Sequence, residues 1–199
     1  MKASLDSYTD GARLATDLVN TSARVRTAGD VLADPDALAR FLAEHDLEPA
    51  ALAGGRSPGH DDLEQVRQLR EDVRAAIEPG TEEQGIADAT ALAARAAGTP
   101  GLHRDRAGRW QWHLTTSPQA SLADELAVTI GMGLLGTLQA LNHDRFRRCA
   151  SPVCDGLFVD TSKSGRRRYC MPEVCGNRLN VANHRARQRA HASGGRGRG

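Results

Sequence analysis

Cys149–Cys175 reads CASPVCDGLFVDTSKSGRRRYCMPEVC and decides the fold of the last quarter of this 199-residue chain. Its cysteines form two pairs, Cys149 with Cys154 and Cys170 with Cys175, and the sequence has no other cysteine. Each pair encloses four residues, and fifteen residues separate the pairs. Zinc prefers four soft or borderline ligands in a tetrahedron. Two short cysteine pairs, joined by an intervening segment that we call the excursion, let a short chain close around one ion. The pattern therefore predicts one zinc ion bound by all four thiolates.

Neither ordinary burial nor a redox role accounts for the four cysteines as well as zinc does. Ordinary buried cysteines would be scattered along the chain, whereas these lie within 27 residues. Neither pair has the Cys-x-x-Cys spacing of a redox disulfide. Four thiolates leave no open coordination position, so the predicted zinc is structural and not catalytic. His143, His184 and His191 could substitute as ligands, but surface positions account for them more simply.

The residues between the two pairs predict how the module folds. Leu157–Val159 has the composition of a strand, Lys163–Arg166 that of a turn, and Arg167–Tyr169 that of a second strand. Such a hairpin would bring the third cysteine back beside the second, and a helix over residues 177–190 would follow the fourth. Knuckle, hairpin and helix in this order predict a treble-clef-like zinc finger. We expect the finger at residues 145–191 and a disordered Gly/Arg tail at 192–199.

Charge divides the chain into two parts. Residues 145–199 hold 13 basic and three acidic residues, a net charge of +10, whereas residues 1–144 hold 13 basic and 22 acidic residues, a net charge of −9. A basic tail on an acidic body indicates an anionic partner for the tail; nucleic acid is the commonest one, and a membrane surface is the competitor. The N-terminus lacks the pattern of a signal peptide, and the apolar stretch 126–141 is short for a membrane span. We therefore expect a soluble cytoplasmic protein that does not enter a membrane, in a reducing compartment where clustered cysteines bind metal.

Residues 1–144 are expected to form a mainly helical domain with one β-hairpin, which makes the fold class α+β. Helical spacing of apolar residues, caps and breakers predict helices over 10–20, from Pro35 to about Leu42, over 63–77, over 82–97 and from Ser117-Pro118 to Leu141. The last of these is apolar on most faces and is expected to be the central core helix. Leu102 and Trp110–Leu114 flank Gly108 and predict the hairpin.

Two parts of the sequence resemble known families. Cys175-Gly176-Asn177-Arg178, together with Leu157–Ser162 and Arg168-Tyr169-Cys170, resembles the CGNR zinc-finger family. Thr16–Thr21 and Asp30–Leu32 resemble the start of the ABATE domain, which precedes that finger in bacterial proteins. The resemblance implies a stress-linked transcription regulator with a ligand-sensing domain at residues 1–144 and a DNA-binding finger after it.

The chain departs from the finger family at two positions. Tyr169 stands where tryptophan is frequent, and Asn180 stands where a lysine is frequent, which weakens one expected phosphate contact. Within the motif, Gly176 would let the backbone approach the metal and Asn177 would cap the helix. Arg178 has two equal interpretations, as a contact to DNA or as a brace for the zinc knuckle.

The arginines of the finger are the residues expected to contact nucleic acid. Arginine binds guanine edges bidentately and also clamps phosphates, while a merely solvated basic helix is the competing interpretation. The expected set is Arg166, Arg167, Arg168, Arg178, Arg185, Arg187 and Arg189. A single finger is a small footprint, so useful specificity calls for a homodimer or a second contact surface.

The resemblance implies that the N-terminal domain binds a small-molecule effector, which the sequence does not identify. Asp17 and Asn20 lie one helical turn apart, and Trp112 and His113 lie on the predicted hairpin beside Trp110. These residues are the candidates for binding it, and helix capping, a buried polar bridge and core packing are the alternatives. No nucleophile elbow, phosphate loop or histidine-rich metal centre is present in the sequence, so we expect no enzyme.

Two other functions remain open at the level of sequence. A basic zinc finger with an Arg/Gly tail suits RNA as well as DNA, which would make the chain an RNA-binding or ribosome-associated protein. Alternatively, the zinc serves only to fold a protein–protein adaptor. Retention of duplex DNA against an RNA competitor separates these functions.

Overall fold

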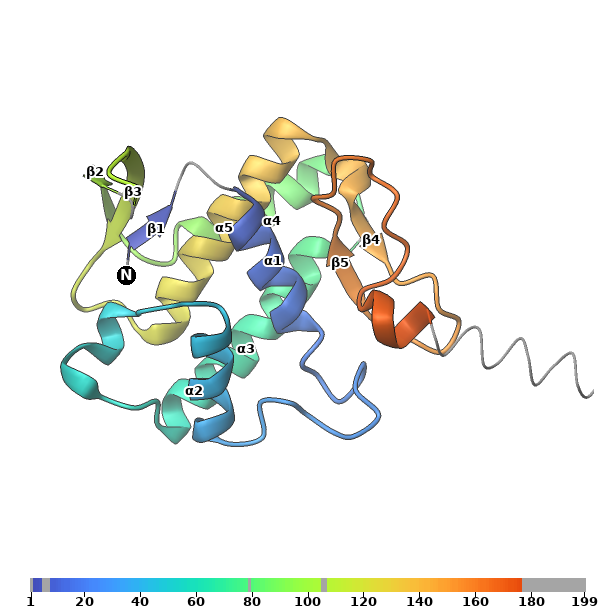
Figure 1. The fold of residues 1–199 in the computed structure, drawn as a ribbon, viewed down its shortest axis with the longest axis horizontal. Helices are drawn as coiled ribbons and strands as arrows, with labels where there is room; N and C mark the ends of the chain where they lie inside the picture. Colours follow the sequence, from blue (N-terminus) through green and yellow to red (C-terminus); the bar gives the residue numbers. More distant parts are fainter. Residues whose placement is uncertain (1, 5–7, 79, 105–106, 177–199) are drawn as a thin grey trace, which may run out of the picture.

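The computed structural model describes residues 2–4, 8–78, 80–104 and 107–176 (Figure 1). In these ranges the helices are α1 (Tyr8–Val19), α2 (Pro35–Glu44), α3 (His60–Ile77), α4 (Glu82–Ala93) and α5 (Leu122–Ala140). The strands are β1 (Lys2–Ser4), β2 (Gly98–Arg104), β3 (Trp110–Thr116), β4 (Phe146–Arg148) and β5 (Leu157–Val159). Short helical turns are η1 (Ala50–Gly55), η2 (His143–Arg145) and η3 (Pro172–Gly176). A mainly helical N-terminal part with a β-hairpin, the predicted α+β class, is thereby confirmed.

Helix α5 is the centre of the fold, and α1, α3 and α4 pack against it (Figure 1). Its apolar side chains, among them Leu126 and Ile130, are fully buried, as the sequence predicts. Gly11 of α1 and Gly133 of α5 lie where these helices cross, and a Cβ atom on Gly133 would stand 2.5 Å from the Cα of Gly11. The crossing therefore depends on two residues without side chains.

Capping side chains test the predicted starts of α2 and α5. Asp34 accepts a hydrogen bond from the Ala37 N–H at 2.7 Å and precedes Pro35, so the predicted start of α2 is confirmed. The predicted start of α5 was wrong. Ser121 caps this helix, its Oγ accepting from the Asp124 N–H at 3.1 Å, because Ser117 and Ala120 close a separate turn before it.

The predicted hairpin forms as β2 and β3, with Gly108 in the turn at φ +77°. Leu102 pairs with Trp112, and Arg104 pairs with Trp110. Strand β1 adds to the other edge of β3, which gives the order β1-β3-β2. The sequence did not predict β1 because its three residues carry no alternating pattern.

Strands β4 and β5 lie on the opposite side of the helices from this sheet (Figure 1). They pair antiparallel, with Arg147 opposite Phe158. The predicted partner of β5 was therefore wrong: Arg167–Tyr169 forms no strand, although the Ala150 N–H donates to the Arg168 carbonyl at 2.8 Å. The reason is burial, since Phe146 of β4 joins Leu157 and Val159 of β5 in the main apolar core.

None of the helices in the described ranges combines the length and apolar composition that a membrane span needs. The helix expected over residues 177–190 and the expected tail lie outside the described residues.

Candidate metal centre

The four cysteines converge on one point. All four Sγ atoms lie within 4.8 Å of one another. Cys154 Sγ lies 3.6 Å from the Sγ atoms of Cys170 and Cys175, and those two lie 3.8 Å apart. A tetrahedral zinc with bonds of about 2.3 Å separates its sulfur ligands by about 3.8 Å. The donor set and its size therefore fit one structural zinc ion held by Cys149, Cys154, Cys170 and Cys175, as predicted.

Three local structures place these thiols. Cys149 follows β4 directly, and a turn in which the Cys154 N–H donates to the Ser151 carbonyl at 3.1 Å forms the knuckle. Cys175 lies in η3, where its N–H donates to the Met171 carbonyl at 2.8 Å. The excursion returns Cys170 beside Cys154, as the sequence predicts, without the second strand that was expected to carry it.

The thiols differ in their ease of ionisation. Burial raises the pKa of Cys154 to about 11, and it raises the pKa of Cys170 further, aided by the neighbouring sulfurs. Burial acts in the same direction on Cys149, but hydrogen bonds from the backbone of Ser151 and Cys170 outweigh it and lower the pKa. Zinc takes cysteine as thiolate, so a bound ion is the group that keeps two such buried sulfurs ionised at neutral pH.

A glycine that the sequence analysis did not single out approaches the thiolates most closely. A Cβ atom on Gly156 would lie 2.4 Å from Cys170 Sγ and 3.1 Å from Cys154 Sγ. Gly176 was expected to have this role, but among the described residues, its chain neighbour Cys175 aside, a Cβ there would meet only the Tyr169 ring, at 3.9 Å. Gly156, directly before β5, therefore has the close approach to the sulfurs of Cys154 and Cys170 that was expected of Gly176.

Asp160 holds the excursion together and was also missed. Its fully buried carboxylate accepts hydrogen bonds from Ser162 N–H at 3.0 Å, from Arg167 N–H at 3.0 Å and from Arg147 Nη1 at 3.1 Å. Burial alone would raise the pKa of Asp160, but a hydrogen bond from the Ser162 hydroxyl, these backbone bonds and the charge of Arg147 bring it below its ordinary value. The Asp-x-Ser spacing, typical of a turn in which Asp accepts from the backbone two residues on, is the signal that could have found it.

The predicted nucleic-acid residues fall into three groups. Arg166 and Arg168 are exposed. Arg167 is half-buried and bonded inward: it stacks over the Phe158 ring at 4.9 Å and donates to the carbonyls of Tyr169 and Cys170. Arg178, Arg185, Arg187 and Arg189 lie outside the described residues.

The predicted effector residues do not come together. Asp17 is partly exposed on α1, 3.6 Å from Arg13 and 3.7 Å from His45. Asn20 is buried just after α1 and donates to the Leu157 carbonyl of β5. Trp112 and His113 lie on β3, on the other side of the helices, with Trp112 about half exposed and His113 buried.

An open hollow of about 510 Å³ lies elsewhere, between α2 and the segment that carries η1. Its floor is apolar, with Leu42, Leu47 and Leu52, and its polar lining residues are Glu48, Arg56 and Ser57. None of the predicted effector residues lines it.

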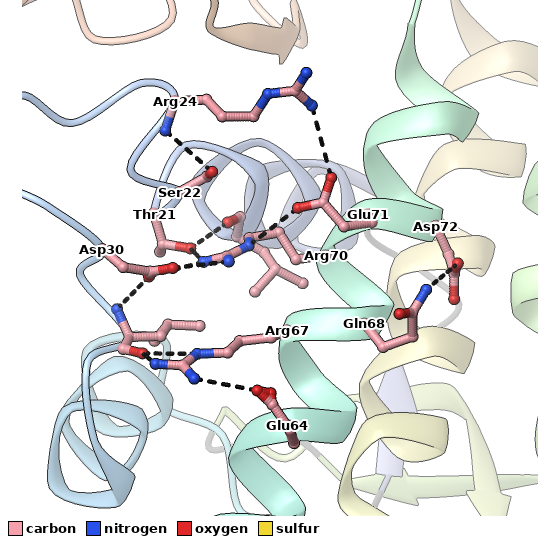
Figure 2. Close-up of polar contacts among 12 residues, drawn as sticks. Thr21, Ser22, Arg24, Asp30, Glu64, Arg67, Gln68, Arg70, Glu71 and Asp72 are labelled. Atoms are coloured by element: carbon pink, nitrogen blue, oxygen red, sulfur yellow. Dashed lines mark hydrogen bonds and ion pairs between the residues drawn. The ribbon is translucent and has the colours of Figure 1, made fainter.

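A polar network joins α3 to the loop after α1 and to the zinc knuckle. Arg70 donates to both carboxylate oxygens of Asp30 at 2.8 Å and to Thr21 Oγ1 at 3.1 Å, and Arg24 reaches Glu71 (Figure 2). Beyond this view, Asp155, next to Cys154, forms ion pairs with three arginines: Arg74 at 3.0 Å, Arg148 at 3.7 Å and Arg24 at 3.9 Å. The zinc knuckle is thus tied by charge to the N-terminal domain.

Comparison with known families agrees with the order of these two parts. The model of the family described as "CGNR zinc finger" matches residues 145–188. The model of the ABATE family, described as "Putative stress-induced transcription regulator", matches residues 12–140, more than half of the chain. A comparison with curated proteins found no match. Both resemblances seen in the sequence are thereby confirmed.

Proposed function

This chain belongs to the ABATE family, described as "Putative stress-induced transcription regulator", and on that premise we propose that it binds duplex DNA through its zinc module under the control of a small molecule. The observation that carries the proposal is the distribution of positive charge on the module. Lys163, Arg166 and Arg168 are exposed, while Arg147 and Arg167 are bonded inward and support the fold. Exposed arginines and lysines beside a rigid metal site are suited to phosphate and base contacts.

The proposed role is binding and not catalysis. Four thiolates occupy all the positions of a tetrahedral zinc, so no position is left for a substrate or a water. We place the protein in the cytoplasm, because a reducing compartment keeps such cysteines available to the metal.

A selection of genomic duplex fragments by the zinc-loaded full chain tests DNA binding. We expect enrichment of a common sequence that persists against excess RNA, and its loss in Cys170→Ser. Equal competition by RNA would favour the RNA-binding alternative. Failure to retain any nucleic acid at physiological salt would favour the adaptor.

We place the effector site in the hollow between α2 and η1. Its volume is within the range of small-molecule sites, and its apolar floor with a few polar groups suits a mainly apolar molecule with one polar end. His45, directly after α2, also lies 3.7 Å from Asp17 of α1. A thermal-shift screen should find a stabilising compound whose effect disappears in Ala43→Trp, which fills the hollow. Loss of the effect in Asn20→Ala instead would return the site to the residues expected from the sequence.

We propose that the DNA-binding form is a homodimer, and that the β2–β3 hairpin contacts a second copy. Leu102, Trp110 and Trp112 are each more than half exposed, and Arg104 stacks on Trp110 at 4.4 Å. Tryptophan and arginine are the residues that most often dominate protein interfaces. Residues 98–116 hold three arginines and one aspartate, whereas the rest of 1–144 holds 10 basic and 21 acidic residues. Opposite charge therefore favours the hairpin of one copy against the acidic surface of the other.

Sedimentation of the wild type and of a Leu102→Ser, Trp110→Ser variant tests the dimer. We expect the wild type to sediment as a dimer that high salt weakens, and the variant as a monomer. A dimer that survives both substitutions would place the interface elsewhere.

A further inference from the structure

The edge of β5 that faces away from β4 is completed by side chains of the N-terminal domain. The Cys149 N–H donates to the Gly156 carbonyl and the Asp160 N–H to the Arg145 carbonyl, so these groups face β4. The alternation of a strand then turns the Leu157 carbonyl and the Val159 N–H to the opposite edge. There the Val159 N–H donates to Thr16 Oγ1 at 3.0 Å, and Asn20 Nδ2 donates to the Leu157 carbonyl at 2.6 Å.

Thr16 and Asn20 can both reach this edge because they are four residues apart and so lie on one face at the end of α1. Both are almost fully buried, at 1% and 2% exposure. Thr16 also donates to the Ala12 carbonyl at 3.0 Å, which leaves its oxygen free to accept from Val159. Each of these polar groups gains part of its hydrogen bonding from β5, so their burial is favourable only while β5 is in place.

Asn20 is also held in one orientation. Its Nδ2 donates to two carbonyls, those of Thr16 and Leu157, both at 2.6 Å. A flipped amide would set Oδ1 against both oxygens, so the hydrogen bonds themselves fix which atom is nitrogen. Its Oδ1 then faces Gly156, 2.7 Å from where a Cβ would stand, and two zinc thiolates border the same position. Asn20 and the sulfurs of Cys154 and Cys170 therefore all crowd the position where Gly156 would carry a Cβ atom.

The apolar contacts of the module include the same domain. Val25, in the loop after α1, belongs to the small cluster formed by Phe158, Cys149, Cys170 and Cys175. The zinc module therefore obtains one edge of its sheet and part of its core from residues more than 120 positions earlier in the chain.

We propose that Thr16 and Asn20 are positioning residues of the zinc site, through which helix α1 sets how tightly the four cysteines hold the ion. The hydrogen bonds of both side chains go to backbone groups and not to the ligand sulfurs. Instead they fix the carbonyl of Leu157 and the N–H of Val159, and these fix Gly156 against Cys154 and Cys170. Coupling of this kind is reciprocal, so zinc in turn stabilises the end of α1.

Zinc transfer from the full-length protein to a chromogenic chelator such as 4-(2-pyridylazo)resorcinol tests the proposal. Thr16→Val removes the acceptor for Val159 and keeps the shape of the side chain. Thr137→Val is the matched control, because buried Thr137 of α5 makes the same kind of bond, to the Gly133 carbonyl at 2.8 Å. Groups that support metal ligands typically change affinity by 10–100-fold, so we expect zinc release at least about tenfold faster in Thr16→Val and in Asn20→Leu, and unchanged in the control.

Equal release rates in Thr16→Val and Thr137→Val would overturn the proposal. Should Asn20→Leu fail to fold, the wild type supplies a second test through hydrogen exchange with and without zinc. Removal of zinc should speed exchange of the Asn20 and Thr21 amides at the end of α1 by a larger factor than exchange of amides in the middle of α5. Unchanged exchange at Asn20 and Thr21 would equally overturn it.

Discussion

Arg74 of α3 meets Asp155 of the zinc knuckle at two points. Its Nη2 donates to the Asp155 carbonyl at 2.9 Å and lies 3.0 Å from the carboxylate Oδ2. The two side chains differ in environment, since Arg74 is 8% exposed and Asp155 is 45% exposed. This ion pair therefore joins a buried cation to a half-exposed anion, and the two residues differ in how well water could solvate them without their partner.

Removing the anion should cost more stability than removing the cation. Asp155→Asn leaves the Arg74 guanidinium buried without its counter-charge, which should cost roughly 1–3 kcal/mol. Arg74→Met leaves Asp155 in contact with water and near Arg148, so a loss below about 1 kcal/mol is expected. Urea unfolding at saturating zinc measures both. A larger loss in Arg74→Met would show that packing of the arginine stem, and not its charge, dominates.

The roles of two glycines can be separated by adding one methyl group to each. Gly156→Ala places a Cβ 2.4 Å from Cys170 Sγ, so the variant should lose most of its zinc. Gly176→Ala places a Cβ no nearer than 3.9 Å to the Tyr169 ring and should keep one zinc per chain. Elemental analysis of both purified proteins is the measurement. Full zinc content in Gly156→Ala would mean that β5 can shift away from the sulfurs without loss.

These glycines also show how far the sequence could be used. The spacing of the cysteines predicts the ligand set, because four thiolates in so short a segment have few other uses. The spacing does not predict which glycine brings the backbone close to the metal site, since Gly156 and Gly176 each follow a cysteine closely. That depends on the pairing of β5 with β4, which is decided by burial of Phe146 in a core formed mainly by distant helices.

The contact between the N-terminal domain and the zinc module could not be predicted from the sequence in advance. Asp17 and Asn20 drew attention as polar residues at helical spacing, and the alternative of a buried polar bridge describes where Asn20 lies. Its partner, a carbonyl 137 residues away, leaves no mark in sequence spacing. The helical spacing of apolar residues predicts the helices because it indicates that one face of each is buried. It does not indicate which residues cover that face.

Stability should fall as the pH drops below about 6.5 because of His45. Burial lowers the pKa of this imidazole, against the opposing effect of Asp17, and it packs on Phe41 at 4.7 Å. A group with a depressed pKa contributes stability that is complete above its unfolded value of about 6.5 and is lost as the pH falls toward its folded value. His45→Gln should therefore flatten the change in unfolding free energy between pH 7.5 and 5.5. An NMR titration that puts the pKa of His45 above 6.5 would contradict this.

Zinc removal should destabilise the whole described fold and not the finger alone. Phe146, Leu157 and Val159 belong to the same apolar core as the five main helices. Loss of the ion loosens the strands that carry them, so a chelator should lower the melting temperature of the helices in a single transition. Circular dichroism at 222 nm follows this directly, with Cys170→Ser as the permanent counterpart. A helical melting curve unchanged by the chelator would instead describe a finger that unfolds independently of residues 1–144.

Neighbouring arginines of the zinc module should separate nucleic-acid binding from folding. Arg166 and Arg168 are exposed, whereas Arg167 donates to the carbonyls of Tyr169 and Cys170. If both exposed residues contact phosphate, Arg166→Ala with Arg168→Ala should flatten the slope of log affinity against log salt by up to about two. Melting temperature and zinc content should stay at the wild-type values.

Arg167→Ala is the matched comparison, and it should show the reverse. Its loss removes the bonds that hold the chain next to Cys170, so zinc retention and melting temperature should fall, while the salt slope of the protein that remains zinc-loaded should stay near that of the wild type. Affinity against salt, measured by fluorescence anisotropy on one labelled duplex, distinguishes the two outcomes. A flattened slope in Arg167→Ala with normal zinc content would mean that this arginine leaves its internal carbonyls to contact the nucleic acid. An unchanged slope in the double variant would move the phosphate contacts to the arginines after residue 176.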